Sequence, residues 1–187
     1  MRRLKKLRRL ARRADIELWS LDECHFQQHG TRTRMWVPPE IRDPVQLHAP
    51  TRKSVACFGA VSLLTGKFVH SIASKFNALT FEAFLKKLLR HRSGARRMLV
   101  VLDNAAYHHA AWLRPLLRKY RRVLSLLFLP PYSPHLAPVE RVWKLVRRLA
   151  THNRYFATLD ELLKAATRCL DRWRKPNSVL RRLCGIT

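Results

Sequence analysis

The sequence predicts an α/β domain built on a mixed five-stranded sheet with helices on both faces. In the first half of the chain, three short apolar segments are separated by turn signals, the pattern of antiparallel strands joined in sequence order. In the second half, continuous apolar runs alternate with apolar residues at helical spacing, the pattern of right-handed βαβ crossovers. The expected sheet therefore has three antiparallel strands followed by parallel additions.

The three antiparallel strands are expected over residues 16–23, 55–64 and 67–74. The first ends in Asp22 and Glu23, whose side chains point to opposite faces of a regular strand. Gly66 provides the hairpin turn between the other two strands. Residues 25–50 are rich in Arg, His and Pro, which indicates a loop or hairpin, with a short strand near residues 35–37.

Helices and buried strands alternate in the second half. Apolar residues at helical spacing predict helices over residues 81–91, 110–120, 138–150 and 159–174. Continuous apolar runs predict strands buried on both faces over residues 97–103 and 123–129. Thr80 is the expected N-cap of the first helix, and Pro138 is the expected first residue of the third. The capping box of Thr158 and Glu161 starts the last helix, and Pro176 ends it.

The charge balance predicts a polyanionic partner. The 187 residues include 38 Lys and Arg against 12 Asp and Glu, a net charge of +26, which favours nucleic acid over an anionic membrane surface. Residues 1–14 form a basic segment or linker remnant without the apolar core of a signal peptide, and residues 15–187 form one domain. We therefore expect a cytoplasmic, nucleoid-associated protein that has no membrane span. The four cysteines form no C-x-x-C pair, so neither a zinc knuckle nor a disulfide framework is expected.

Because acids are few, most can be assigned an ordinary structural role. Those roles are helix first turns, the Pro-rich loop and a mid-helix position, and they cover Glu82, Asp160, Glu161, Glu40, Asp43 and Asp171. The acids left over are Asp15, Glu17, Asp22, Glu23, Asp103 and Glu140. Among these, Asp22 and Asp103 end strands, and Glu140 lies in the first turn of a helix that follows another strand. Neighbouring strand ends would bring the three together.

Three converging carboxylates in so basic a chain are unfavourable unless a cation lies between them. Two Mg²⁺ or Mn²⁺ ions, about 3.5–4 Å apart, would neutralise them and suit phosphoryl chemistry. Each acid also has a plainer alternative. Glu140 could pair with Lys144 four residues later, and Asp103 could cap the turn that follows it.

Three segments resemble the motif blocks of a known family. They are SLDECHF around Asp22, VVLDNAAYHHA around Asp103 and LPPYSPHLAPVERVW around Glu140. They look like the blocks of the DDE transposases of the insertion-sequence branch of the Tc/mariner superfamily. The interval 140 − 103 = 37 positions fits the mid-thirties spacing of that superfamily.

The resemblance implies a ribonuclease-H-like catalytic core in which Asp22, Asp103 and Glu140 are the catalytic metal ligands. It also implies cleavage of DNA at the terminal inverted repeats, followed by attack of the freed 3′-hydroxyl on target DNA, commonly at TA. The expected partners are transposon-end and target DNA, and a second copy of the chain in a homodimer. Further candidates for supporting the acids or touching DNA are Glu23, Asn104, His108, Tyr132, Ser133, Arg32, Arg34, Trp36 and Lys144.

Some candidates keep a second interpretation. Asn104 could simply form a turn. The pairs His25 and His29, and His108 and His109, suggest zinc, but no third clustered ligand accompanies them. A ribonuclease H or a junction resolvase would share the core and the metals but would not be expected to carry PPYSP…PVE.

The chain departs from the family in two respects. His135 and Ala137 stand where the family usually has Asp and Asn, so the helix that carries Glu140 lacks a capping side chain at Ala137, which would loosen it. The family normally has an N-terminal helix-turn-helix region for the inverted repeats, whereas Asp22 lies near the start of this chain. Three alternatives follow: a separate helix-turn-helix polypeptide, one half of a split transposase, or a truncated and inactive DNA-binding remnant.

Overall fold

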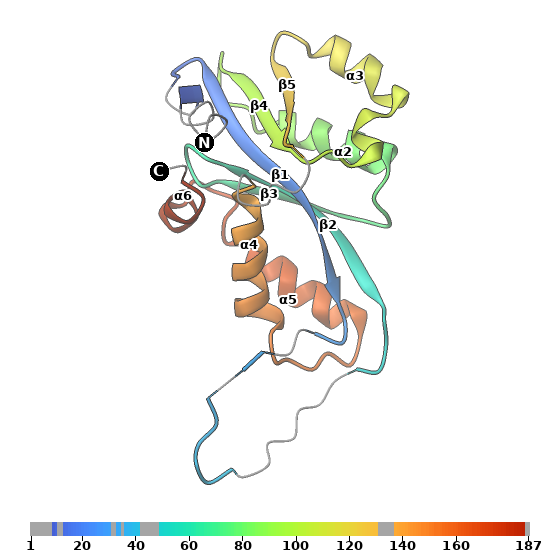
Figure 1. Cartoon of the computed structure of the whole chain (residues 1–187), viewed down its shortest axis with the longest axis vertical. Helices are drawn as coiled ribbons and strands as arrows, with labels where there is room; N and C mark the ends of the chain where they lie inside the picture. Colours follow the sequence, from blue (N-terminus) through green and yellow to red (C-terminus); the bar gives the residue numbers. More distant parts are fainter. Residues whose placement is uncertain are drawn as a thin grey trace.

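A mixed five-stranded sheet in the order β3-β2-β1-β4-β5 forms the centre of the computed structural model (Figure 1). The model describes residues 9–10, 13–30, 33–34, 36–41, 49–130 and 137–185. The strands are β1 (Ile16–Gln27), β2 (Ser54–Ser62), β3 (Phe68–Ala73), β4 (Arg97–Leu102) and β5 (Leu124–Phe128). The first three pair antiparallel, and β4 and β5 add in parallel beside β1. The predicted sheet is confirmed.

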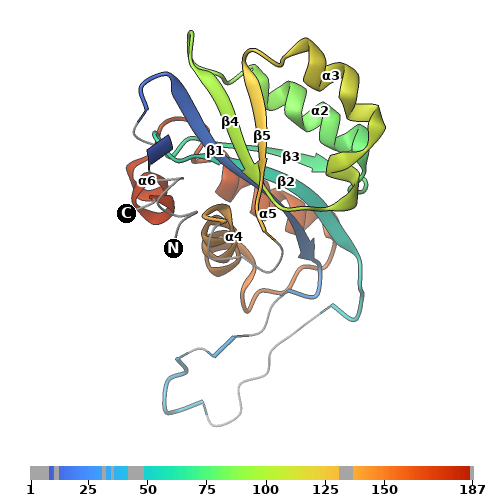
Figure 2. The ribbon, with the colours of Figure 1, turned by 45° about the horizontal axis from the view of Figure 1, so that its top comes forward.

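Helices cover both faces of the sheet (Figure 2). One layer contains α2 (Ala78–Leu89), the short 3₁₀ turns η1 (Ala106–His109) and η2 (Ala111–Leu113), and α3 (Arg114–Lys119). The other contains α4 (Val139–Val146), the π-helical turn η4 (Arg147–Thr151), α5 (Leu159–Asp171) and α6 (Ser178–Cys184). Each layer buries its own apolar cluster against the strands.

The first strand differs from its prediction because it is longer. It continues to Gln27, because β2 pairs with it along that whole length, so Asp22 and Glu23 lie inside the strand. Pairing with β4, however, ends at Ser20. Asp22 therefore lies where β1 separates from β4, which keeps it near the end of that neighbour. The predicted short strand near residues 35–37 is absent from the described residues 33–34 and 36–41.

The predicted hairpin turn is confirmed. Gly66 has φ +71°, and a side chain there would also meet the Asn177 carbonyl oxygen at 2.1 Å, so glycine is required both by the turn and by the packing. The four cysteines are free and buried, as expected. In the described part of the chain, no helix combines the length and the apolar character that a membrane span needs.

Several helix predictions need correction. The N-cap of α2 is Asn77, and Thr80 is its third residue, whose hydroxyl completes a capping box by accepting from the Asn77 amide. Residues 110–120 are divided between η2 and α3, as Pro115 predicts, because proline can occupy only the first turn of a helix. The strand β5 is only half-buried, because it lies at the edge of the sheet. The sequence reading also missed α6.

Candidate active site

Two of the six unassigned acids have structural roles. Asp15 forms an ion pair with Arg13 at 2.6 Å. The buried carboxylate of Glu17 accepts hydrogen bonds from the amide and the hydroxyl of Ser93, at 2.9 and 3.1 Å. These contacts leave Asp22, Glu23, Asp103 and Glu140 without such a role.

Two acids assigned earlier lie elsewhere than predicted. Glu82 follows the first turn of α2, where it pairs with Lys86 at 2.7 Å. Asp171 is the last residue of α5 and not mid-helix, and its carboxylate contacts His70 and Arg174.

Asp22 lies close enough to the other three acids to interact with each of them. Its carboxylate accepts a hydrogen bond from Trp143 Nε1 of α4 at 3.1 Å. Burial, followed by the charges of Glu23, Glu140 and Asp103, raises the pKa of Asp22 to about 7. The structure thus brings the three predicted acids close enough to interact, although they come from β1, the end of β4 and the first turn of α4.

Gly59 makes the contact between Asp22 and Trp143 possible. It lies directly opposite Asp22 on β2, and a Cβ there would stand 2.3 Å from the indole of Trp143. The Trp143 ring therefore packs directly against the backbone of Gly59, and its N–H reaches the Asp22 carboxylate on the neighbouring strand. The sequence reading missed both Gly59 and Trp143, although Trp143 follows Glu140 by three residues and so shares its side of the helix.

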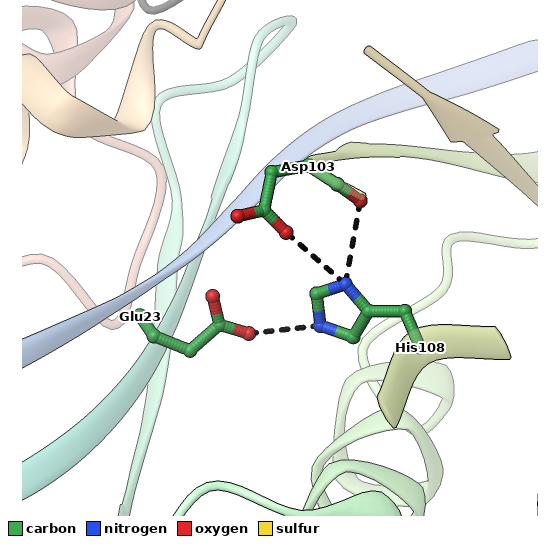
Figure 3. Close-up of side chains that lie close together, drawn as sticks. All are labelled: Glu23, Asp103 and His108. Atoms are coloured by element: carbon green, nitrogen blue, oxygen red, sulfur yellow. Dashed lines mark hydrogen bonds and ion pairs between the residues drawn. The ribbon is translucent and has the colours of Figure 1, made fainter. Parts of the chain in front are cut away.

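Asp103, Glu23 and His108 form a second cluster (Figure 3). His108 Nε2 lies 3.0 Å from Glu23 Oε1, and Nδ1 lies 3.2 Å from Asp103 Oδ1 and 3.3 Å from the Asp103 carbonyl oxygen. The imidazole is fully buried, whereas 57% of the Asp103 side chain is exposed. Because each ring nitrogen already faces a carboxylate, the ring bridges the two acids.

The adjacent acids of β1 serve different layers, as the alternation of a strand predicts. Asp22 turns toward α4, and Glu23 turns toward η1, where His108 lies. The amide of Ala105 donates to Asp103 Oδ1 at 3.1 Å, so the predicted capping role of Asp103 is also present. Capping and a role in the acidic centre are thus compatible.

Glu140 lies partly exposed in the first turn of α4. Among the described residues it has no ion pair with Lys144, so the plainer interpretation of this acid is not supported. The N-cap position falls on Pro138 and has no side-chain cap. The hydroxyl of Ser20 on β1 accepts from the Val139 amide at 3.4 Å, which replaces part of the missing cap and anchors the helix to the sheet.

The other predicted residues lie at varied distances from this centre. Asn104 donates through Nδ2 to the Leu129 carbonyl at 2.5 Å, which ties the end of β4 to the end of β5. Arg34 and Trp36 are exposed, and in the described part of the chain neither bonds to the acids. Arg32, Tyr132 and Ser133, with the departure at His135, lie outside the described residues.

The donor set fits Mg²⁺ or Mn²⁺. Both ions prefer oxygen ligands, and Asp22 offers carboxylate oxygens close to those of Asp103 and Glu140. Burial first, and then the charges of Glu23, Glu140 and Asp103, raise the pKa of Asp22, and no Lys or Arg among the described residues forms an ion pair with it. A divalent cation would supply that compensation.

A family model described as DDE superfamily endonuclease matches residues 17–163, a range that contains all four acids. The chain belongs to the DDE superfamily endonucleases. This DDE endonuclease is 31% identical over 118 residues to the Sinorhizobium fredii protein y4pE/y4sA, covering 63% of this chain and 82% of that protein. It is 30% identical over 167 residues to the Tcb1 transposase of Caenorhabditis briggsae, covering 79% of this chain and 59% of the transposase.

Solved transposase structures share the fold of this DDE endonuclease. A Mos1 transposase paired-end complex with the left transposon end has a TM-score of 0.68 at 19% identity over 97% of this chain and 54% of that one. A Mos1 paired-end complex with Mg has a TM-score of 0.67 at 20% identity, again over 97% and 54%. The catalytic domain of Mos1 gives 0.64 at 16% identity, over 97% of this chain and 80% of that domain. The chain therefore spans little more than half of the complete transposases. The ribonuclease-H-like fold of the integrase and transposase catalytic domains is confirmed.

Proposed function

We propose that residues 15–187 form the catalytic domain of a DNA transposase that cuts DNA at element ends and joins the freed 3′-hydroxyl to target DNA. The observation that carries this proposal is the convergence of carboxylates from β1, β4 and α4 upon Asp22, whose pKa is raised to about 7 by burial and then by the charges of Glu23, Glu140 and Asp103. Structural roles explain most other acids. The group formed by Asp22, Asp103 and Glu140 is partly buried, and none of the three forms an ion pair with Lys or Arg in the described residues.

Asp22, Asp103 and Glu140 would hold two divalent ions, Mg²⁺ or Mn²⁺. When bound, such ions activate the attacking oxygen and stabilise the leaving oxygen of a phosphodiester. The protein orients these ligands through the Trp143 indole, the Ala105 amide and the His108 ring. Glu23 lies at the other nitrogen of the His108 ring from Asp103, and we assign it a supporting role.

The reaction we assign has two phosphoryl-transfer steps. Water first attacks a phosphodiester at the element end and releases a 3′-hydroxyl. That hydroxyl then attacks a phosphodiester of the target, and the target's own 3′-oxygen leaves. Neither step requires a covalent bond to the protein.

DNA is the proposed partner because of the net charge of +26 and because the related Mos1 chains were solved with transposon ends. Residues 1–14 would add a basic contact to the DNA backbone or serve as a linker. Two ends must be joined, which favours a homodimer in the DNA complex, and TA is the proposed target.

The test compares Asp103→Asn with Asp160→Asn. Both changes replace a carboxylate by an amide of the same shape, but Asp160 pairs with Lys164 on the surface of α5. Mg²⁺- or Mn²⁺-dependent nicking of supercoiled plasmid, and cleavage of DNA carrying the flanking element's ends, should be lost only in Asp103→Asn. Equal activity in both variants would remove Asp103 from the reaction.

A second candidate function is a DNA-binding remnant that lacks catalysis, such as an inactive truncated copy or one half of a split transposase. Wild type that is folded and binds DNA, but cuts nothing with either metal, would favour it. The presence of Asp22, Asp103 and Glu140 together favours the catalytic interpretation.

A further inference from the structure

A basic cavity lies at the β3 edge of the sheet. It has a volume of about 280 Å³ and is lined by Phe68, Val69, His70, Lys87, His91 and Arg174. These residues come from β3, from the C-terminal end of α2 and from the turn after α5. Elements from both helical layers thus meet there around one hollow.

Hydrogen bonds hold the wall of this cavity in place. His70 is 7% exposed, and its Nε2 lies 2.9 Å from Asp171 Oδ1. The same oxygen lies 2.8 Å from Arg174 Nε. Lys87 Nζ donates to the His70 carbonyl oxygen at 2.7 Å. The positions of the basic groups are therefore fixed before any ligand arrives, which lowers the entropy cost of binding.

The positive charge at the cavity exceeds the negative charge in contact with it. Asp171 is shared between two basic partners, and Lys87 has no carboxylate partner among the described residues. Arg174 uses Nε toward Asp171, so its terminal amino groups have no described partner. Burial, with the charges of Lys67, Lys87, Arg90 and Arg174, lowers the pKa of His91 below its ordinary value. The cavity is thus electropositive.

Stabilisation of helix ends does not account for this arrangement. Cations are common in the last turn of a helix because they interact with its carbonyl groups. Lys87, however, bonds to strand β3, and Arg174 comes from a different element. Lys87 and Arg174 thus line the same cavity from different elements.

We infer that this cavity binds a backbone phosphate of the DNA on which the domain acts, through Lys87, His91 and Arg174. The point charge of Lys and the fork of Arg both suit phosphate oxygens. The inference rests on the proposed action on DNA.

The sheet register places the cavity near the carboxylates. His70 lies opposite Gly59, and Gly59 lies opposite Asp22. Two strand spacings of about 4.8 Å separate His70 from Asp22.

The test measures DNA affinity by fluorescence anisotropy at several salt concentrations. Lys87→Gln should lower the slope of log K against log salt by about 0.9, the value for one lost phosphate contact. Arg90→Gln, the matched control, removes a positive charge at the same helix end but outside the cavity lining, and should keep the wild-type slope. Equal slopes in the two variants would overturn the inference.

Two further measurements keep the test decisive. Lys87→Arg retains the charge and should retain the slope. Arg174→Gln, which also removes a charge from the cavity lining and should lower the slope by about 0.9, replaces the first variant if Lys87→Gln does not fold. Titration with inorganic phosphate, followed through the ring resonances of His70 and His91, separates the sources of the group. Saturation by free phosphate with unchanged DNA slopes in Lys87→Gln would assign the cavity to a small anion and refute the DNA assignment. Failure of DNA cleavage would refute the proposed function but would leave these binding results unaffected.

Discussion

Replacement of Trp143 by Phe would isolate one hydrogen bond at the candidate site. The indole of Trp143 lies over Gly59, contacts Phe68 edge to face, and donates its N–H to Asp22 at 3.1 Å. Phenylalanine keeps a ring over the glycine and much of the contact with Phe68. The principal loss is therefore the donor to the carboxylate.

The size of the effect follows from the charge and the burial of the acceptor. A hydrogen bond to a charged group contributes about 1.5–3 kcal/mol, which corresponds to roughly a ten- to hundredfold change in an equilibrium constant. Because the N–H fixes the orientation of the Asp22 carboxylate, we expect the Mg²⁺ concentration for half-maximal plasmid nicking to rise by about this factor. DNA affinity at fixed salt should stay unchanged.

The matched control is Trp19→Phe. Trp19 is fully buried on the same strand as Asp22, and its Nε1 has no hydrogen-bond partner among the described residues. The same atoms are removed, but no bond to an acid is lost. Mg²⁺ titrations that coincide for the two variants, with both proteins folded by circular dichroism, would refute the positioning role of Trp143.

Three further predictions address packing, the second cluster and the thiols. Gly59→Ala places a Cβ 2.3 Å from the Trp143 ring and should destabilise the fold by about 1–3 kcal/mol. In the control, Gly94→Ala, the new Cβ meets open space, so the fold should lose only about 1 kcal/mol through the positive φ. Similar melting temperatures for the two variants would contradict the packing argument. His108→Phe leaves two carboxylates facing each other and should lower metal-dependent nicking at least about tenfold, with His109→Phe as the control close to wild type. Burial raises the pKa of all four thiols, so they should not react with an aromatic disulfide reagent at pH 8 in the native protein. After denaturation all 4 should react. Rapid labelling of the native protein would show that the packing is wrong.

The sheet could be predicted from the sequence because each strand carries its own apolar pattern. That pattern could not distinguish a central strand from an edge, so the half-buried state of β5 was missed. The helix α6 was missed for a related reason. It has only seven residues, about two turns, which is too short for periodicity to indicate a helix. Its N-cap, Asn177, directly follows Pro176, whose helix-breaking effect predicts the end of the preceding helix and gives no sign that another begins.

The candidate site was predicted to the extent that strand ends determine it. Asp103 and Glu140 could be selected because they follow the neighbouring strands β4 and β5, whereas Asp22 lies inside β1, just beyond the point where its pairing with β4 ends. The groups that orient them could not be selected in this way, since they act across long sequence separations. Trp143 is 121 positions from Asp22, and His108 is 85 positions from Glu23. A tryptophan on an apolar helix face or a histidine after a strand has many ordinary explanations until the structure shows its partner.

The groups that orient the carboxylates also explain how a chain of charge +26 maintains an acidic centre. An indole N–H holds Asp22, and a backbone amide holds Asp103. Neither donor carries a charge. In the described part of the chain, no Lys or Arg forms an ion pair with Asp22, Asp103 or Glu140, although such residues are abundant. Neutral donors can orient a carboxylate without cancelling its charge, so the electrostatic attraction of the centre for an external cation is retained while its geometry is fixed.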